Sequence, residues 1–340
     1  MRRVLSLLPT LAAGALLAPS AFAADCAVAK TVVEKAICAD PELKTADDAM
    51  TAAYEAVLPK LGADQQGALK ANQEAWLKLR EDNCVMEEGR KECVLERTTW
   101  RANYLGATAE TGPGLAAAPL PFVSTRPLSP KTCAADVSLH KFIPGAGAGE
   151  TAFNAAIDKI ATGAETDWGA RDPDLPPDLE CSYSLDSTIT YGSADLVSSS
   201  IMFYAFGGGA HGIYGRLPVT VDLKTGKAFN PADRFDKTAL TTLATACTAS
   251  LREEKIKRYG DFDPADRDSM IAQLDEEMKG YVEVIAANVA DAGKWLIYAD
   301  RAEIYFDPYA VGSYAEGEFT CQLPNATLAA AAGSKGWIIP

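Results

Sequence analysis

Eight cysteines constrain this chain more than any other feature, because each disulfide holds two separate points of the backbone at a fixed distance. Their number is even, so four disulfides are predicted for a chain that folds in an oxidising compartment. There is no Cys-x-x-Cys pair and there are only two histidines, so a zinc site is not expected. The cysteines are Cys26, Cys38, Cys84, Cys93, Cys133, Cys181, Cys247 and Cys321.

Residues 1–23 have the pattern of a secretory signal peptide. Arg2 and Arg3 precede a short apolar run that two prolines and a glycine interrupt, and small residues lead to a cleavage site expected after Ala23. Asp25 precedes Cys26 where lipid attachment requires a small residue, so an acylated anchor is not expected. No later stretch is apolar for long enough to cross a bilayer. We therefore expect a periplasmic or secreted protein without an integral membrane segment.

The chain is acidic, with 32 Lys and Arg against 46 Asp and Glu and a formal net charge of −14. Removal of the two arginines of the signal leaves 30 basic side chains and a net charge of −16. Such a surface repels nucleic acid and attracts basic proteins. The charge predicts a basic protein partner and no nucleic acid, although solubility alone also accounts for it.

Residues 107–130 are rich in Pro, Ala, Gly, Ser and Thr, which is typical of an extended linker. They separate residues 24–106 from residues 131–340 and divide the cysteines four and four. Each half can then close its own two disulfides, and for four cysteines three pairings remain open. The sequence therefore predicts two domains.

Residues 24–106 have the pattern of a disulfide-bonded all-α hairpin or bundle. Thr31 and Glu34 have capping-box spacing at the start of a short helix, and Asp40-Pro41 begins a longer one. Apolar residues at helical spacing mark two further helices. Short connections predict antiparallel neighbours, and two disulfides compensate for a small core.

Residues 131–340 combine strand and helix patterns. Alternating β-branched and aromatic residues predict strands between residues 187 and 223, and helical periodicity then covers residues 238–258 and 265–290. Strands are predicted again between residues 295 and 323. This order indicates an α+β domain with a mainly antiparallel sheet and two helices on one face.

Two runs in the helical half are distinctive. They are Val33-Glu-Lys-Ala-Ile-Cys38-Ala-Asp-Pro-Glu-Leu43 and Gln73-Glu-Ala-Trp76-Leu-Lys-Leu-Arg80, the second followed by Cys84 and Cys93. On these runs the half resembles the N-terminal domain family of the lysozyme inhibitor LprI. The resemblance implies an exported helical domain with disulfides, which in some members of the family is tied to lysozyme inhibition.

Several spaced segments in the second half occur in a characteristic order. They are Gly208-Gly-Ala-His211-Gly, Val221-Asp-Leu-Lys-Thr-Gly-Lys227, Ile304-Tyr-Phe-Asp-Pro-Tyr309 and Ser313-Tyr-Ala-Glu-Gly317. Together they resemble the C-terminal domain of the anti-sigma factor RsiV, which senses lysozyme by binding it. No anti-sigma segment is recognised in this chain, so the resemblance implies the binding role without the signalling role.

His211 raises the question of catalysis, because it is one of two histidines and follows a glycine run. A catalytic base needs a nucleophile and an orienting acid, and no Gly-x-Ser-x-Gly elbow is present. A metal ligand needs further ligands, and His140 is the other imidazole. We therefore favour a loop histidine hydrogen-bonded to the backbone, with a contact residue in a binding loop as the alternative.

The candidate partner-contact residues are His211, Gly209, Tyr214, Tyr309 and Tyr314. The segment from Tyr305 to Tyr309 is most simply a strand that ends in an Asp-Pro turn with its aromatics in the core. The alternative places Tyr309 and Tyr314 on an exposed loop, where tyrosine is a common contact residue. No catalytic, cofactor-binding or metal-binding residue is predicted.

These observations favour a non-enzymatic, exported binding protein of the cell envelope, similar to a lysozyme inhibitor. Its predicted partner is a basic cell-wall-degrading enzyme, and c-type lysozyme is the first candidate. One alternative is a protein associated with a peptidoglycan-modifying hydrolase or deacetylase, whose chemistry needs a His and Asp metal set. Another is an envelope interaction domain with an unrelated ligand.

Overall fold

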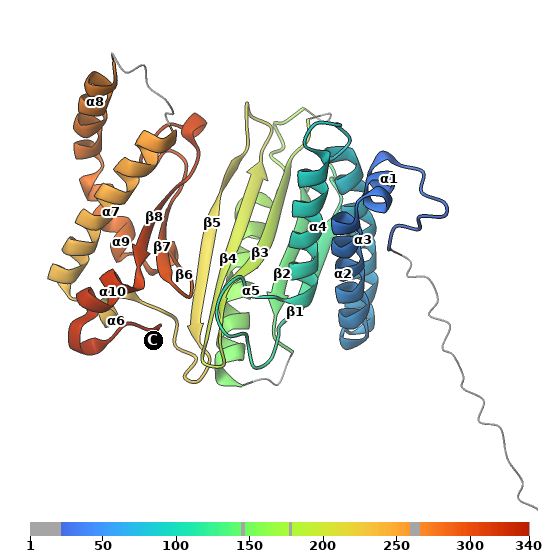
Figure 1. The fold of residues 1–340 in the computed structure, drawn as a ribbon, viewed down its shortest axis with the longest axis horizontal. Helices are drawn as coiled ribbons and strands as arrows, with labels where there is room; N and C mark the ends of the chain where they lie inside the picture. The colour runs from blue at the N-terminus through green and yellow to red at the C-terminus, as the bar shows by residue number, and fades with distance from the viewer. Residues whose placement is uncertain (1–21, 144–146, 177–178, 259–265, 340) are drawn as a thin grey trace, which may run out of the picture.

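A helical unit, a five-stranded sheet and a three-stranded sheet lie side by side in the computed structural model (Figure 1). The structure describes residues 22–143, 147–176, 179–258 and 266–339. Almost all of the predicted signal peptide, residues 1–21, lies outside these ranges. Within them, no helix is both long enough and apolar enough to cross a membrane.

The helical unit has the caps that the sequence predicts. Thr31 and Glu34 form a capping box, and the Asp40 carboxylate accepts hydrogen bonds from the first backbone N–H groups of the next helix. The unit consists of α1 (Val32–Ala39), α2 (Pro41–Val57), η1 (Leu58–Lys60), α3 (Ala63–Asn83) and α4 (Arg90–Gly106). The prediction of a helical, disulfide-bonded N-terminal region is therefore confirmed.

The eight cysteines form four disulfides, and each bond stays within one half of the chain. Two bonds close short loops in the helical unit and two join distant segments of the α+β half. The pairs are Cys26–Cys38, Cys84–Cys93, Cys133–Cys181 and Cys247–Cys321. These pairings decide between the alternatives that spacing left open.

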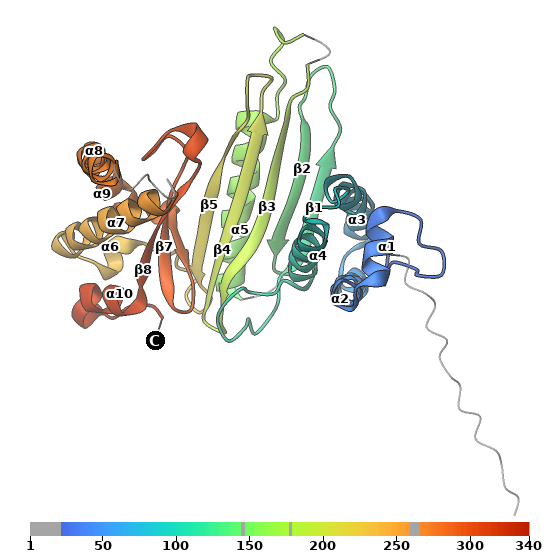
Figure 2. The ribbon, with the colours of Figure 1, turned by 45° about the horizontal axis from the view of Figure 1, so that its top comes forward.

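The five-stranded sheet has the strand order β1-β2-β3-β4-β5. All neighbouring strands are antiparallel except β2 and β3, which are parallel. The strands are β1 (Leu120–Arg126), β2 (Ala134–Lys141), β3 (Ser182–Gly192), β4 (Leu196–Phe206) and β5 (Ile213–Asp222). Helix α5 (Ala148–Trp168), which the sequence analysis missed, covers one face and carries the chain between the two parallel strands (Figure 2).

The prediction that residues 107–130 form an extended linker is wrong. Leu120–Arg126 forms edge strand β1, and Thr111 makes a parallel bridge to Tyr191 of β3. Pro121 is the one proline of this segment that lies within β1, and it is compatible with an edge strand, whose outer side needs no backbone donor. Val123 is buried against the helical unit, so the segment joins the two halves through contact instead of holding them apart.

The second sheet is separate from the first, so the single sheet expected from the sequence is divided into two. Its strands β6 (Trp295–Ile297), β7 (Arg301–Phe306) and β8 (Phe319–Pro324) are antiparallel and follow this order in space. The α+β class with helices against an antiparallel sheet is confirmed. The remaining elements are α6 (Pro231–Arg234), α7 (Lys237–Arg258), α8 (Arg267–Gly280), α9 (Val282–Ala290), η2 (Ala292–Lys294), η3 (Tyr314–Glu316), α10 (Asn325–Ala332) and η4 (Gly333–Lys335).

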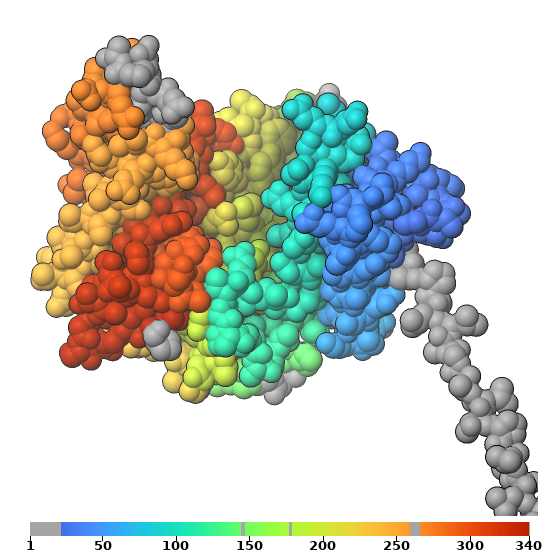
Figure 3. Space-filling view, viewed as in Figure 1, coloured from blue at the N-terminus to red at the C-terminus, as the bar shows by residue number. Residues whose placement is uncertain are grey.

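Two apolar cores belong to the α+β half, one between α5 and the five-stranded sheet and one in the three-stranded unit, which is the three-stranded sheet with the helices packed against it. Phe153 and Ile157 of α5 are fully buried against the inward side chains of the five-stranded sheet. Leu251 of α7 and Trp295 of β6 belong to the core of the three-stranded unit. In Figure 3 the blue helical unit and the orange-to-red unit flank the yellow-green surface of the five-stranded sheet.

The helical unit meets the sheet through a buried cation. Arg101 of α4 is 1% exposed, and its guanidinium donates to the side-chain oxygens of Gln73 and Asn72 at 2.8 Å. Asn72 in turn lies 3.5 Å from Ser138 and from Asp136 of β2. A buried charge is tolerated only when such partners replace its hydration shell, so Arg101 fixes how α3 and α4 lie on β2.

Three titratable groups of the sheet lie in this interface, namely Asp136, Asp186 and His140. Burial raises the pKa of Asp186 to about 7, with the carboxylate of Asp136 as a second cause. Burial lowers the pKa of His140 to about 4. The Tyr104 carbonyl can only accept, so Nε2 of His140 donates to it at 2.8 Å and Nδ1 accepts from the Ser187 hydroxyl. His140 is therefore a structural residue of the interface.

We predict that Arg101→Ala destabilises the oxidised mature protein by about 3 kcal/mol, because it leaves Gln73 and Asn72 buried without their partner. Urea unfolding followed by circular dichroism measures the change. Arg97→Ala, an exposed arginine of the same helix, is the control and should change stability by less than about 0.5 kcal/mol. Equal effects of the two substitutions would contradict the role of the buried guanidinium.

We predict that Asp186→Asn gains stability relative to the wild type as pH rises from about 4 to above 7. The folded protein holds the Asp186 proton more tightly than the unfolded chain does, so ionisation costs stability over this range. The buried neutral His140 acts in the opposite direction, because its contribution to the free energy of unfolding falls as pH drops below about 6.5. Both proteins contain His140, so this contribution cancels in the difference between them. Urea titrations at several pH values measure that difference.

The control for this pH dependence is Asp82→Asn, which removes an exposed carboxylate on α3. A difference between Asp186→Asn and the wild type that does not vary with pH would show that burial has not raised the pKa of Asp186.

Candidate functional site

Five aromatic rings gather where the loop between β4 and β5 meets the segment that follows β7. We name this group the tyrosine cluster; it consists of Tyr204, His211, Tyr214, Tyr309 and Tyr314. The His211 ring stacks on Tyr314, with centroids 3.9 Å apart and planes 25° from parallel. The ring centroids of Tyr309 and Tyr214 lie 5.6 and 5.9 Å from that of Tyr314. Tyr314 is thus the centre of the cluster.

Two hydrogen bonds lock the cluster to the glycine loop. The Tyr314 hydroxyl donates to the Gly212 carbonyl at 2.7 Å, and Nδ1 of His211 donates to the same oxygen at 2.9 Å. Desolvation and the neighbouring tyrosines raise the pKa of Tyr314, so its hydroxyl stays a donor at neutral pH. Because Nδ1 of His211 is bound to backbone, the imidazole is oriented as a loop residue with an exposed face.

Glycine is required at two places in this loop. Gly208 has φ of +90°, and a Cβ on Gly212 would lie 2.4 Å from the Tyr204 ring. Gly212 therefore lets the strand pass under the tyrosine. The predicted contact residue Gly209 is exposed, and a Cβ there would approach no atom other than the His211 carbonyl oxygen, at 4.0 Å. The structure brings together four of the predicted contact residues but leaves Gly209 outside the cluster.

Tyr309 combines exposure with an unusual backbone. Its φ is +72°, in the left-handed region that non-glycine residues rarely adopt, and 63% of the residue is exposed. The Asp307-Pro308 turn before it is closed by a hydrogen bond from Ala310 N–H to the Asp307 carbonyl at 3.0 Å. Tyr305 and Phe306 are buried, so the segment is a core strand that ends in a turn carrying an exposed tyrosine.

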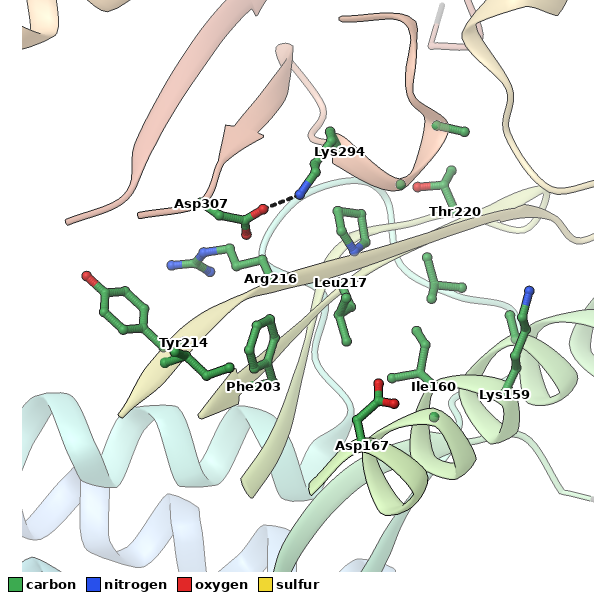
Figure 4. A pocket seen from close by; sticks show the side chains of 18 of the residues that line it. Lys159, Ile160, Asp167, Phe203, Tyr214, Arg216, Leu217, Thr220, Lys294 and Asp307 are labelled. Carbon is green, nitrogen blue, oxygen red and sulfur yellow. Dashed lines mark hydrogen bonds and ion pairs between the residues drawn. The ribbon is translucent and has the colours of Figure 1, made fainter. Parts of the chain in front are cut away.

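A groove of about 780 Å³ begins at the tyrosine cluster and runs along the outer edge of β5. Figure 4 shows α5 on one side of it, with Lys159, Ile160 and Asp167, and the Lys294–Asp307 ion pair on the other. Its lining is mainly apolar and includes Ile160, Trp168, Phe203, Leu217 and Tyr214. Concave, apolar surfaces with a few polar groups are the usual form of binding sites.

Positive and negative side chains balance around the groove, where Lys159 and Asp167 of α5 carry opposite charges. Lys294 forms an ion pair with Asp307, and Arg216 forms one with Glu318 at 2.9 Å. Tyr305 packs under the Arg216 guanidinium and donates its hydroxyl to Glu318. Burial, and that hydrogen bond to a carboxylate, raise the pKa of Tyr305. The groove is therefore close to neutral in an otherwise acidic protein.

The arrangement is suited to binding. The Nδ1 of His211 is held by a carbonyl, and the neighbouring rings are tyrosines. No group of three or more His, Cys, Asp or Glu side chains within the described ranges could hold a metal ion. What the cluster and groove offer a partner is a set of aromatic faces, an apolar surface and a strand edge.

Sequence reasoning missed the half of this region that α5 supplies. Phe153, Ile157 and Ala164 recur at helical spacing along one face of α5, and this periodicity could have identified the helix. Tyr204 was also missed, because it becomes part of the cluster only through its pairing with Tyr214 across β4 and β5. The register of that pairing cannot be predicted from the neighbouring residues in the sequence alone.

Comparison with known proteins places a different family on each half of the chain. Residues 23–105 match the family "Lysozyme inhibitor LprI", and residues 229–326 match "Protein of unknown function (DUF3298)", the region found in RsiV-type C-terminal domains. Both resemblances drawn from the sequence are confirmed. The helical domain is therefore similar to the LprI family and part of the C-terminal half to DUF3298, and the LprI match and the disulfides indicate a location outside the cytoplasm.

Two crystal structures of DUF3298 proteins are similar to part of this chain. One is from Pseudomonas aeruginosa PAO1, with 14% identity and a TM-score of 0.36, and one is from Bacteroides fragilis NCTC 9343, with 15% identity and a TM-score of 0.38. In each case the match covers 62% of this chain and 90% of the other. A search of curated proteins gave no match.

We predict that Tyr309→Gly is more stable than Tyr309→Ala by about 1 kcal/mol. Both substitutions remove the exposed ring, but glycine also relieves the positive φ, which alanine retains. Urea unfolding of the two variants under identical conditions measures the difference. Equal stabilities would mean that residue 309 does not occupy the left-handed conformation in solution.

Proposed function

We propose that this protein is an extracytoplasmic, non-enzymatic binding protein whose partner is a basic cell-wall-degrading enzyme of the c-type lysozyme class. The observation that carries the proposal is the match of the disulfide-bonded helical domain to the lysozyme inhibitor family. The DUF3298 region supports it, because the RsiV domain that it resembles binds lysozyme.

The net charge of the exported chain favours such a partner. A charge of −16 after signal removal accelerates association with a basic enzyme and makes the rate sensitive to salt. Long-range attraction gives little specificity of its own. Short-range contacts are therefore needed as well.

The tyrosine cluster is our candidate for these contacts. Tyr309 is 63% exposed and held in place by its turn, and the His211 and Tyr314 rings are locked to the loop by the Gly212 carbonyl. Rigid aromatic side chains bury much area for little loss of conformational entropy, and tyrosine is enriched among residues that dominate interfaces. The cluster could therefore supply specificity in addition to charge.

We predict saturable binding of hen-type lysozyme to the oxidised mature protein, measured by calorimetry at low and at physiological salt. Binding should weaken with salt but persist, because apolar and aromatic contacts are not screened. Loss of all binding at physiological salt would mean charge attraction alone and would contradict the proposed function. A lysozyme activity assay at stoichiometric protein then tests inhibition.

Two variants locate the contact surface. Tyr309→Gly should weaken lysozyme binding about tenfold, whereas Leu79→Ala, which removes an exposed side chain of α3 in the helical unit, should leave it unchanged. The reverse result would place the interface on the helical unit and refute the role of the tyrosine cluster while leaving lysozyme binding itself intact.

A further inference from the structure

The outer edge of β5 lies along the groove but belongs neither to the apolar core nor to the tyrosine cluster. β5 is the last strand of the five-stranded sheet, so one side of its backbone has no neighbouring strand of that sheet. An edge strand presents N–H and C=O groups at the spacing of an extended chain. Proteins normally cover or interrupt such an edge.

Hydrogen bonds identify which residues of β5 point their backbone groups outward. The Asp222 N–H donates to the Lys227 carbonyl at 3.0 Å, and Phe229 N–H donates to the Thr220 carbonyl at 2.9 Å. The even-numbered residues therefore face the edge, since backbone direction alternates along a strand. Pro218 fits this parity, because an edge-facing position needs no N–H.

The edge is covered at one end and open at the other. Residues 227–229 already lie along it at Thr220 and Asp222, with an antiparallel bridge between Val221 and Ala228. Toward the tyrosine cluster, the N–H groups of Tyr214 and Arg216 take part in none of the hydrogen bonds found among the described residues. The same holds for the carbonyls of Tyr214, Arg216 and Pro218. The position of a sixth strand beside β5 is thus occupied at one end by residues 227–229 and open at the other.

The groove beside this open edge fits side chains of an added strand. Ile160 and Trp168 of α5 and Leu217 of β5 line it. Gly163 of α5 also faces it, and a Cβ on Gly163 would meet no atom within 4 Å. Alternate side chains of a strand point to one face, so every second residue of an added chain would enter this apolar space.

Charge identifies the chemistry of the occupant. The groove itself is close to neutral, because Lys294 and Arg216 are paired with Asp307 and Glu318 and the charge of Lys159 is offset by that of Asp167. The exported protein around it carries a net charge of −16. An apolar segment is therefore matched to the groove, and basic residues on either side of that segment are matched to the surrounding surface.

We propose that the open edge of β5, from Tyr214 to Pro218, binds an extended peptide segment of a partner protein as an added strand. Its backbone bonds to Tyr214 and Arg216, its alternate apolar side chains enter the groove beside Gly163, and basic residues flank it. This is recognition by strand addition, in which the main chain gives affinity and the pockets give specificity. The site goes beyond the proposed function, since it does not require the partner to be a lysozyme.

The test uses the oxidised mature protein and the synthetic peptide acetyl-KKVTVTVKK-amide. Its control is the same peptide with alternate backbone nitrogens methylated, in two versions that cover both strand edges. Fluorescence anisotropy of labelled peptides should show saturable binding at physiological salt, and methylation on one edge should weaken it at least tenfold. Absence of saturable binding, or equal binding of both methylated versions and the parent, would overturn the proposal.

Hydrogen exchange resolved by NMR locates the bound peptide. The amides of Tyr214 and Arg216 should exchange rapidly in the free protein and at least tenfold more slowly with saturating peptide. The Leu217 amide, which faces β4 in the pairing with Ile201, should be protected in both states. Peptide binding without slowing at Tyr214 and Arg216 would place the peptide elsewhere and overturn the proposal.

Substitutions at two glycines, one in the groove and one on α3, test where the peptide side chains lie. Gly163→Leu fills the groove where a side chain has space, and it should weaken peptide binding at least tenfold. Gly67→Leu adds the same side chain to α3, where a Cβ also meets no atom within 4 Å, and should stay within twofold of the wild type. Unchanged Leu217 protection shows that the variants are folded. Equal binding by both variants would overturn the placement of side chains in the groove.

Discussion

The structure depends on covering both faces of the five-stranded sheet. Helix α5 buries one face with an apolar core, and the other face carries polar side chains that the helical unit partly covers. Arg101 makes this second contact specific, since its guanidinium is buried and satisfied only when α3 and α4 hold Gln73 and Asn72 in place. Burying a charge is costly, so a displaced helical unit would leave several polar groups without partners at once.

The disulfides stabilise units that are small for independent folding. Cys26–Cys38 and Cys84–Cys93 close short loops around a helical unit with a limited core. Cys247–Cys321 spans 74 residues and ties α7 to β8, so it restricts the unfolded chain more. The short bonds hold local geometry in the helical unit, while the long one joins elements of the three-stranded unit that are far apart in sequence.

The candidate site exists because these units are placed against one another. The tyrosine cluster takes His211 from the loop between the strands of one sheet and Tyr314 from the segment after β7 of the other. The groove takes its two walls from α5 and from η2 with the turn that follows β7. A rigid scaffold that presents loop residues is a common basis for recognition. The tyrosine cluster and the β5 edge are neighbours, so one partner could contact both.

The sequence by itself determined the local and periodic features. Capping at Thr31 and Asp40, the helices of the N-terminal unit, the α+β order and the division of eight cysteines into two sets of four follow from residue types and spacing. Only the tertiary structure decided the disulfide pairs, the split into two sheets and the strand at Leu120–Arg126 that replaced a predicted linker. It also decided the meeting of His211 with Tyr314. These features rest on contacts between residues far apart in the chain, whose energies depend on register and packing that no local window of sequence contains.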